Sequence, residues 1–228
     1  MDFHRLQHTH NSLEYFFLVF PILYLTVICF GIINYNKIRG SLYLKLFLIF
    51  ITYSLITEIL GYIFGVIFKR NSFFIYNTWN FINNYFFFFF FLGILGNGLK
   101  KQLLKFLILS YTVLSIIDLL FFTSFVENSM NVNIIIGSII IVIAVLMYLT
   151  NLLENDTILY FKNSMFFWIS LGVLLFNIGF VPVFVVAEFI EYKGAYRYIS
   201  FALNILMNLI FIIGFIVSKK EYNFQNIK

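Results

Sequence analysis

Long apolar stretches alternate with short polar ones along the whole chain. A helix that crosses a membrane needs about 20 mostly apolar residues, and seven segments meet this requirement. They cover residues 13–35, 43–68, 75–97, 103–125, 132–152, 163–187 and 198–218. The pattern predicts an all-α bundle of seven transmembrane helices over residues 13–218, preceded by a short extracytoplasmic segment, 1–12, and followed by a cytoplasmic tail, 219–228.

The composition supports a membrane protein. Of the 228 residues, 62% are hydrophobic and only 11% are charged, whereas about a quarter of the residues in a soluble domain are charged. Every predicted loop is shorter than the roughly 50 residues that a folded soluble domain needs. Any function is therefore expected within the bundle, at its two surfaces, or through a partner.

Basic residues predict the orientation, because cytoplasmic loops carry an excess of Lys and Arg. Five basic residues would lie on one side: Arg5, Lys69, Arg70, Lys193 and Arg197. Ten would lie on the other: Lys37, Arg39, Lys45, Lys100, Lys101, Lys105, Lys162, Lys219, Lys220 and Lys228. The N-terminus is then expected outside and the C-terminus in the cytoplasm, with the chain as a multi-pass protein of the inner (cytoplasmic) membrane.

The net charge of +5 is accordingly interpreted as a report of topology, and no nucleic-acid partner is expected. The expected partners are the lipid bilayer, a small ligand or lipid headgroup, and a cytoplasmic or membrane protein that contacts the basic loops.

Six consecutive phenylalanines, Phe86 to Phe91, follow the asparagine pair Asn83 and Asn84. An unbroken apolar run has no periodicity that would assign a buried face. We interpret the run as apolar filler that faces lipid and neighbouring helices, favoured by the codon bias of an AT-rich genome. The alternative is a dedicated aromatic site.

Polar side chains within the spans are the candidate site. Glu58 and Asp118 are acids within spans that contain no Lys or Arg, so their partners would be amides, hydroxyls, water or a bound cation, unless they stay protonated. Counting about 1.5 Å per residue from each span's midpoint places most of the polar groups in one layer in the outer half of the bundle. The proposed outward-facing ligand pocket contains Glu58, Asn77, Asn80, Asn84, Asp118, Asn177, Asn204 and Asn208. The alternative is that each amide bonds a different pair of helices.

Several chemistries are disfavoured. The three histidines, His4, His8 and His10, all precede the first span. His4 and His8 have a spacing that can hold zinc, but no carboxylate or cysteine cluster completes the set, so no metal site and no cofactor are expected. Intramembrane zinc hydrolysis would need histidines within the spans, and a retinal Schiff base would need a lysine in the last span.

Two resemblances extend this picture. ITEILGYIFG, residues 56–65, followed by YNTWNFINNYFFFFFF, residues 76–91, resembles seven-helix integral membrane proteins of AT-rich Bacteroidota, a likeness that implies the fold and no particular activity.

Asn80-x-x-x-Asn84 and Asn204-x-x-x-Asn208 also occupy equivalent places in a three-plus-one-plus-three arrangement of helices. In this respect the chain is similar to sugar transporters of the SWEET and PQ-loop group. It departs from them at Pro21, which is followed by Ile where they have Gln, and in its fifth span, which has no proline.

The leading hypothesis is a receptor-like or signalling protein that binds a small ligand or lipid headgroup in the outer pocket, without enzymatic activity. One alternative is a small-solute transporter. The other is an intramembrane lipid enzyme that uses Glu58 and Asp118.

Overall fold

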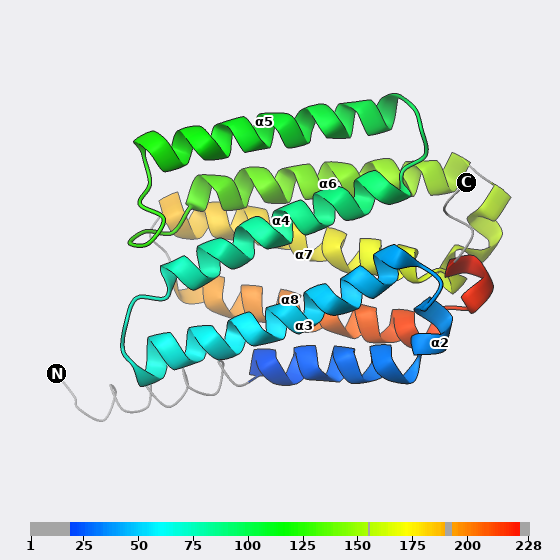
Figure 1. The fold of residues 1–228 in the computed structure, drawn as a ribbon, viewed down its shortest axis with the longest axis horizontal. Coiled ribbons are helices and arrows are strands. Elements are labelled where there is room, and N and C mark those ends of the chain that lie inside the picture. The colour runs from blue at the N-terminus through cyan, green and yellow to red at the C-terminus, as the bar shows by residue number, and fades with distance from the viewer. Residues whose placement is uncertain (1–18, 155, 190–192, 224–228) are drawn as a thin grey trace.

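The computed structural model describes residues 19–154, 156–189 and 193–223, and every regular element within these ranges is helical. The chain passes through the helix Val19–Ile33 and then through further helical elements, of which Figure 1 labels α2 to α8. These are α2 (Tyr35–Ile38), α3 (Leu42–Tyr62), the π-helical turn η1 (Ile63–Ile67), α4 (Phe73–Ile94), α5 (Leu99–Phe121), α6 (Asn131–Glu154), η2 (Asp156–Asn163), α7 (Met165–Phe189), α8 (Lys193–Val217) and η3 (Lys220–Asn223).

Five of the described helices are long and apolar enough to cross a membrane. They are Leu42–Ile67, Leu99–Phe121, Asn131–Glu154, Met165–Val186 and Tyr198–Val217. The helix Val19–Ile33 is apolar but shorter, and α4 has the length but carries four asparagines. The chain is thus a bundle of apolar helices suited to a membrane, as the sequence predicted.

The long helices lie side by side along one direction, and consecutive helices run antiparallel (Figure 1). Helices α7 and α8 form the most extensive pair, α6 packs on α7, and α4 contacts α3, α5 and α6. One end of the bundle carries α2, η2 and η3. The opposite end carries loops 68–72 and 122–130.

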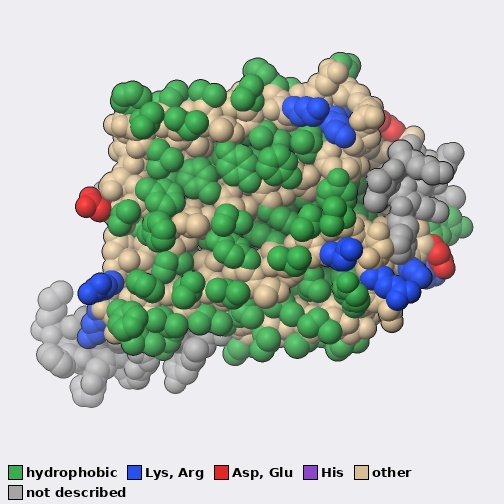
Figure 2. Space-filling model, in the orientation of Figure 1, with side chains coloured by type: hydrophobic (Ala, Val, Ile, Leu, Met, Phe, Trp, Pro, Cys, Tyr) green, Lys and Arg blue, Asp and Glu red, His purple; other side chains and the backbone are tan. Residues whose placement is uncertain are grey.

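Charge separates between these two ends. The structure describes nine of the ten basic residues that were predicted on the cytoplasmic side. All nine lie at, or within about two helical turns of, the end that carries α2, η2 and η3. We call this end the basic end. Figure 2 shows most of the Lys and Arg side chains on this face of the molecule gathered at the basic end, with a wide green apolar surface between the two ends. The opposite end carries Lys69 and Arg70 in loop 68–72. Apolar sides between charged ends are what a membrane-embedded bundle requires.

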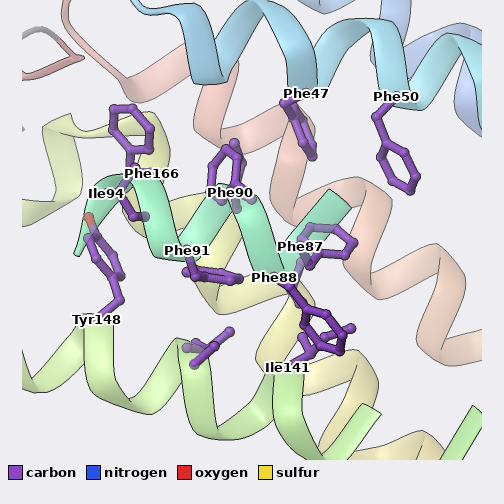
Figure 3. Close-up of a cluster of buried hydrophobic side chains, with 14 of the residues drawn as sticks. Phe47, Phe50, Phe87, Phe88, Phe90, Phe91, Ile94, Ile141, Tyr148 and Phe166 are labelled. Carbon is purple, nitrogen blue, oxygen red and sulfur yellow. The ribbon is translucent and has the colours of Figure 1, made fainter. Parts of the chain in front are cut away.

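The Phe run is part of the protein core. Most of its members face neighbouring helices, as expected, but the expectation that they also face lipid is wrong for them. Phe88 and Phe91 are fully buried, Phe87 and Phe90 nearly so, and only Phe89 is mostly exposed, at 56%. Other helices surround α4, as Figure 3 shows. The reason for the error is that a central helix and a lipid-facing helix are equally apolar, so composition does not distinguish them.

Rings from several helices pack on this run. The Phe86 ring stacks on Phe50 of α3 with the centroids 4.2 Å apart. The Phe88 ring meets Tyr111 of α5 edge-on at 5.2 Å. The half of the bundle toward the basic end is thereby filled with aromatic side chains.

Candidate functional site

A cavity of about 270 Å³ lies in the other half of the bundle, away from the basic end. Its lining comes from the helix Val19–Ile33 and from α3, α4, α6, α7 and α8. The residues that contribute polar atoms are Tyr24, Ser54, Glu58, Tyr76, Trp79, Asn80, Asn83, Ser138, Asn177, Ser200 and Asn204. Six phenylalanines share the lining: Phe20, Phe50, Phe87, Phe176, Phe180 and Phe211.

Four of the eight residues predicted from sequence line this cavity together: Glu58, Asn80, Asn177 and Asn204. They lie on α3, α4, α7 and α8, so the structure brings together groups that are up to 146 positions apart in the chain. The shared depth expected for these four residues corresponds to one continuous space.

Among the residues that the structure describes, Glu58 is the only acid in the lining, and no Lys, Arg or His lines it. No hydrogen bond or ion pair connects Glu58 to any residue in the described ranges. The hydroxyls of Tyr24 and Tyr76 lie close enough to its carboxyl group to interact with it electrostatically. The Tyr76 ring rests against Gly61, one turn beyond Glu58, where a side chain would displace it.

One amide nitrogen and one hydroxyl oxygen in the lining are buried without a hydrogen-bond partner among the described residues. Asn80 accepts a 3.4 Å bond from Asn84 at its Oδ1, but its Nδ2 is buried and finds no acceptor among the described residues. The Oγ of Ser200 is buried and equally without a partner there. Buried polar groups are almost always hydrogen-bonded, so a bound ligand or ordered water is the expected partner of these atoms.

Asn177 and Asn204 each donate to their own helix. The Nδ2 of Asn177 bonds the Val173 carbonyl at 2.8 Å, and the Nδ2 of Asn204 bonds the Ser200 carbonyl at 3.0 Å. Their Oδ1 atoms receive no hydrogen bond from a described residue. The lining therefore offers acceptors from α7 and α8 and an unused donor from α4.

The other four predicted residues do not line the cavity. Asn77 fixes the loop between α5 and α6: its Nδ2 donates to the carbonyls of Phe125 and Asn128, both at 2.8 Å, and its Oδ1 accepts from the amide of Met130 at 3.2 Å. Asn208 donates to the Asn204 carbonyl one turn earlier, at 2.8 Å.

Asn84 and Asp118 connect α4, α5 and α6. Asn84 donates at 2.9 Å to the Tyr111 hydroxyl and packs directly against Gly137. Asp118 accepts from Asn133 of α6 at 2.6 Å and lies outside the cavity lining. Glu58 and Asp118 therefore belong to separate sites.

Sequence reasoning missed much of the lining on α4. Tyr76, Trp79, Asn80, Asn83 and Phe87 all line the cavity, and their spacings of three and four residues place them on one face of a helix. That spacing was visible in the sequence. The prediction instead selected the helix face that carries Asn77, Asn80 and Asn84, of which Asn77 and Asn84 point to neighbouring elements.

In the described ranges, no group of three or more His, Cys, Asp or Glu side chains could hold a metal ion. His4, His8 and His10 lie outside those ranges. No protein-family model, curated protein or solved structure matches this chain. The two resemblances stated above therefore stay predictions.

Proposed function

We propose that this chain is a receptor-like protein that crosses the inner membrane seven times and binds a small ligand in the cavity around Glu58. The observation that carries the proposal is the unpaired Glu58 carboxyl group, which shares a space of about 270 Å³ with the unpaired Nδ2 of Asn80 and Oγ of Ser200. Polar groups within a membrane protein are costly, and they usually mark ligand or ion sites.

The orientation in this proposal has the N-terminus outside and the C-terminus in the cytoplasm. Nine basic residues at the basic end support a cytoplasmic placement of that end. The half of the bundle that contains the cavity would then be the outer half. A ligand would reach the cavity from the outer side or from the outer leaflet.

Aromatic side chains between the cavity and the basic end favour ligand binding over transport. Phe50, Phe87 and Phe211 line the cavity and also belong to the buried aromatic core. Toward the basic end these three rings adjoin a core of aromatic and aliphatic side chains, which would impede the passage of a polar solute. This arrangement suits a protein that senses occupancy from one side.

A small-solute transporter is the second candidate. Asn80 and Asn204, which occupy equivalent places in the three-plus-one-plus-three scheme, line the same cavity. Transport would require the Phe50, Phe87 and Phe211 layer to open, so solute uptake into liposomes separates the two functions. The enzyme hypothesis loses its acid pair, because Asp118 bonds Asn133 outside the cavity.

Cysteine labelling tests the proposal. In a Cys29→Ser background, Asn80→Cys and Asn204→Cys are treated with a membrane-impermeant maleimide added to the outside of intact cells. Both cysteines are expected to react, because both positions line the cavity. Ser124→Cys in the exposed loop 122–130 is the accessible control, and Ser170→Cys on α7, which is fully buried, is the inaccessible one. An outward-facing cavity is refuted if Ser124→Cys reacts and both cavity cysteines stay unlabelled.

A further inference from the structure

The described cavity lining contains an acidic residue and no basic one. Glu58 is the single acid among the described lining residues, and none of these is a Lys, Arg or His that could neutralise it. An ionised acid within a membrane costs at least a few kcal/mol unless it is paired. A ligand that carries positive charge would supply the partner that the described residues do not.

Aromatic faces dominate the rest of the lining. Nine of the 21 lining residues are Phe, Tyr or Trp, contributed by five helices. A cation is attracted to the face of an aromatic ring within about 6 Å of its centre, and most strongly to Trp. Trp79 is held in place by a 3.1 Å bond from its Nε1 to the Oγ of Ser54, which fixes one such ring in the lining.

Size restricts the ligand further. The cavity has a volume of about 270 Å³. This is slightly below the range of about 300–1,000 Å³ for drug-sized pockets. The space suits a compact molecule or a lipid headgroup, and it is too small for a lipid's acyl chains as well.

We propose that the cavity binds a small organic ammonium ion, with the cationic nitrogen held by the Glu58 carboxylate and by aromatic faces that include Trp79. The unpaired Nδ2 of Asn80 would donate to an oxygen on the same ligand. This inference rests on the proposed ligand-binding function and names the chemical class of the ligand. The ammonium group comes either from a soluble amine or from the headgroup of a choline or ethanolamine phospholipid.

Trp79 provides the readout. The chain has two tryptophans, and Trp168 lies at the start of α7, where its Nε1 bonds the Lys162 carbonyl. A Trp168→Phe chain therefore reports fluorescence from the cavity alone. The chain is reconstituted in phosphatidylglycerol nanodiscs, which contain no amine headgroup. It is then titrated with choline and with 3,3-dimethyl-1-butanol, a neutral molecule of nearly the same shape.

Choline is expected to change Trp79 emission saturably, at a concentration at least about tenfold lower than the neutral isostere requires. Glu58→Gln should abolish this preference. Glu58→Asp, which keeps the charge, should retain it with weaker affinity and guards against a Gln variant that fails to fold. Glu127→Gln, in the exposed loop 122–130, is the matched control and should behave as the parent chain.

Phosphatidylcholine nanodiscs distinguish the two sources of the ammonium group. If a lipid headgroup occupies the cavity, Trp79 emission in these discs already equals that of the choline-saturated state, and free choline adds nothing. If the ligand is a soluble amine, free choline produces the same response in both lipids. Either result supports the ammonium site.

Equal responses to choline and to its neutral isostere would overturn the ammonium assignment, as would no response to either probe in both lipids. In these cases the labelling of Asn80→Cys and Asn204→Cys decides the broader proposal. Labelled cysteines leave the outward-facing ligand cavity standing with a different ligand, whereas unlabelled cysteines remove the cavity and the ammonium site together.

Discussion

The Nδ2 of Asn133 on α6 donates a 2.6 Å hydrogen bond to the Oδ2 of Asp118 on α5. Thr123 donates to the other carboxylate oxygen at 2.9 Å, and Ser115 donates to the Oδ1 of Asn133. Both oxygens of Asp118 are therefore occupied by donors, one from α6 and one from the loop that follows its own helix. Glu58 has no such partner among the described residues, so the two acids have different surroundings.

Asp118→Ala should destabilise the protein, because it leaves the buried Nδ2 of Asn133 without an acceptor. The expected cost is about 1–3 kcal/mol in the free energy of unfolding, measured by chemical unfolding in mixed micelles. Asn133→Ala should cost a similar amount, and the double variant should cost less than the sum. Additive losses would contradict a direct Asp118–Asn133 interaction.

Asn77→Ala should release the loop between α5 and α6. The substitution removes three hydrogen bonds to that loop, from the Nδ2 to the carbonyls of Phe125 and Asn128 and from the Met130 amide to the Oδ1. Faster proteolysis within residues 122–130 is expected, with a loss of about 1–3 kcal/mol in stability. Thr78→Ala on the same helix is the control, since its hydroxyl bonds only the Phe74 carbonyl one turn earlier. An unchanged cleavage rate would show that Asn77 does not hold the loop.

Phe88→Ala and Phe89→Ala form a matched pair of adjacent substitutions. Phe88 is fully buried, whereas Phe89 is 56% exposed. Truncating a buried Phe leaves a cavity and costs about 3–5 kcal/mol, so Phe88→Ala should lower the thermal stability strongly. Phe89→Ala should cost less than half as much. Equal effects would contradict the difference in burial between these two neighbours.

Gly137→Ala should force α4 and α6 apart. A Cβ atom at this position would collide with the amide of Asn84, which the Tyr111 hydroxyl holds in place. Overpacking of this kind costs about 1–3 kcal/mol and should appear as a lower melting temperature. Gly96→Ala is the control, because a Cβ there would meet nothing within 4 Å. A Gly137→Ala chain as stable as the control would refute the close contact.

The proposed orientation predicts the outcome of C-terminal fusions. A fluorescent protein fused after Lys228 should fold and emit light, because it would remain in the cytoplasm. Alkaline phosphatase fused at the same place should be inactive, because it would not reach the oxidising outer compartment. Active phosphatase with a dark fluorophore would reverse the orientation and place the cavity in the inner half.

The sequence by itself determined that the chain forms apolar helices and how charge divides between their ends. Both follow from local chemistry: a long apolar stretch satisfies its backbone groups within a helix, and Lys and Arg stay with the polar ends. Counting along each span also placed Glu58, Asn80, Asn177 and Asn204 at a common depth, and all four line one cavity.

Only the tertiary structure decided which way each side chain within the helices points. Depth along a helix is one coordinate, and rotation about the helix axis is another, which changes by about 100° per residue because a turn contains 3.6 residues. That rotation is set by packing between helices. It turns Asp118 toward Asn133 and Asn77 toward the α5–α6 loop, while Glu58 faces the cavity. It also buries Phe88 and exposes Phe89, two identical neighbours that the sequence could not tell apart.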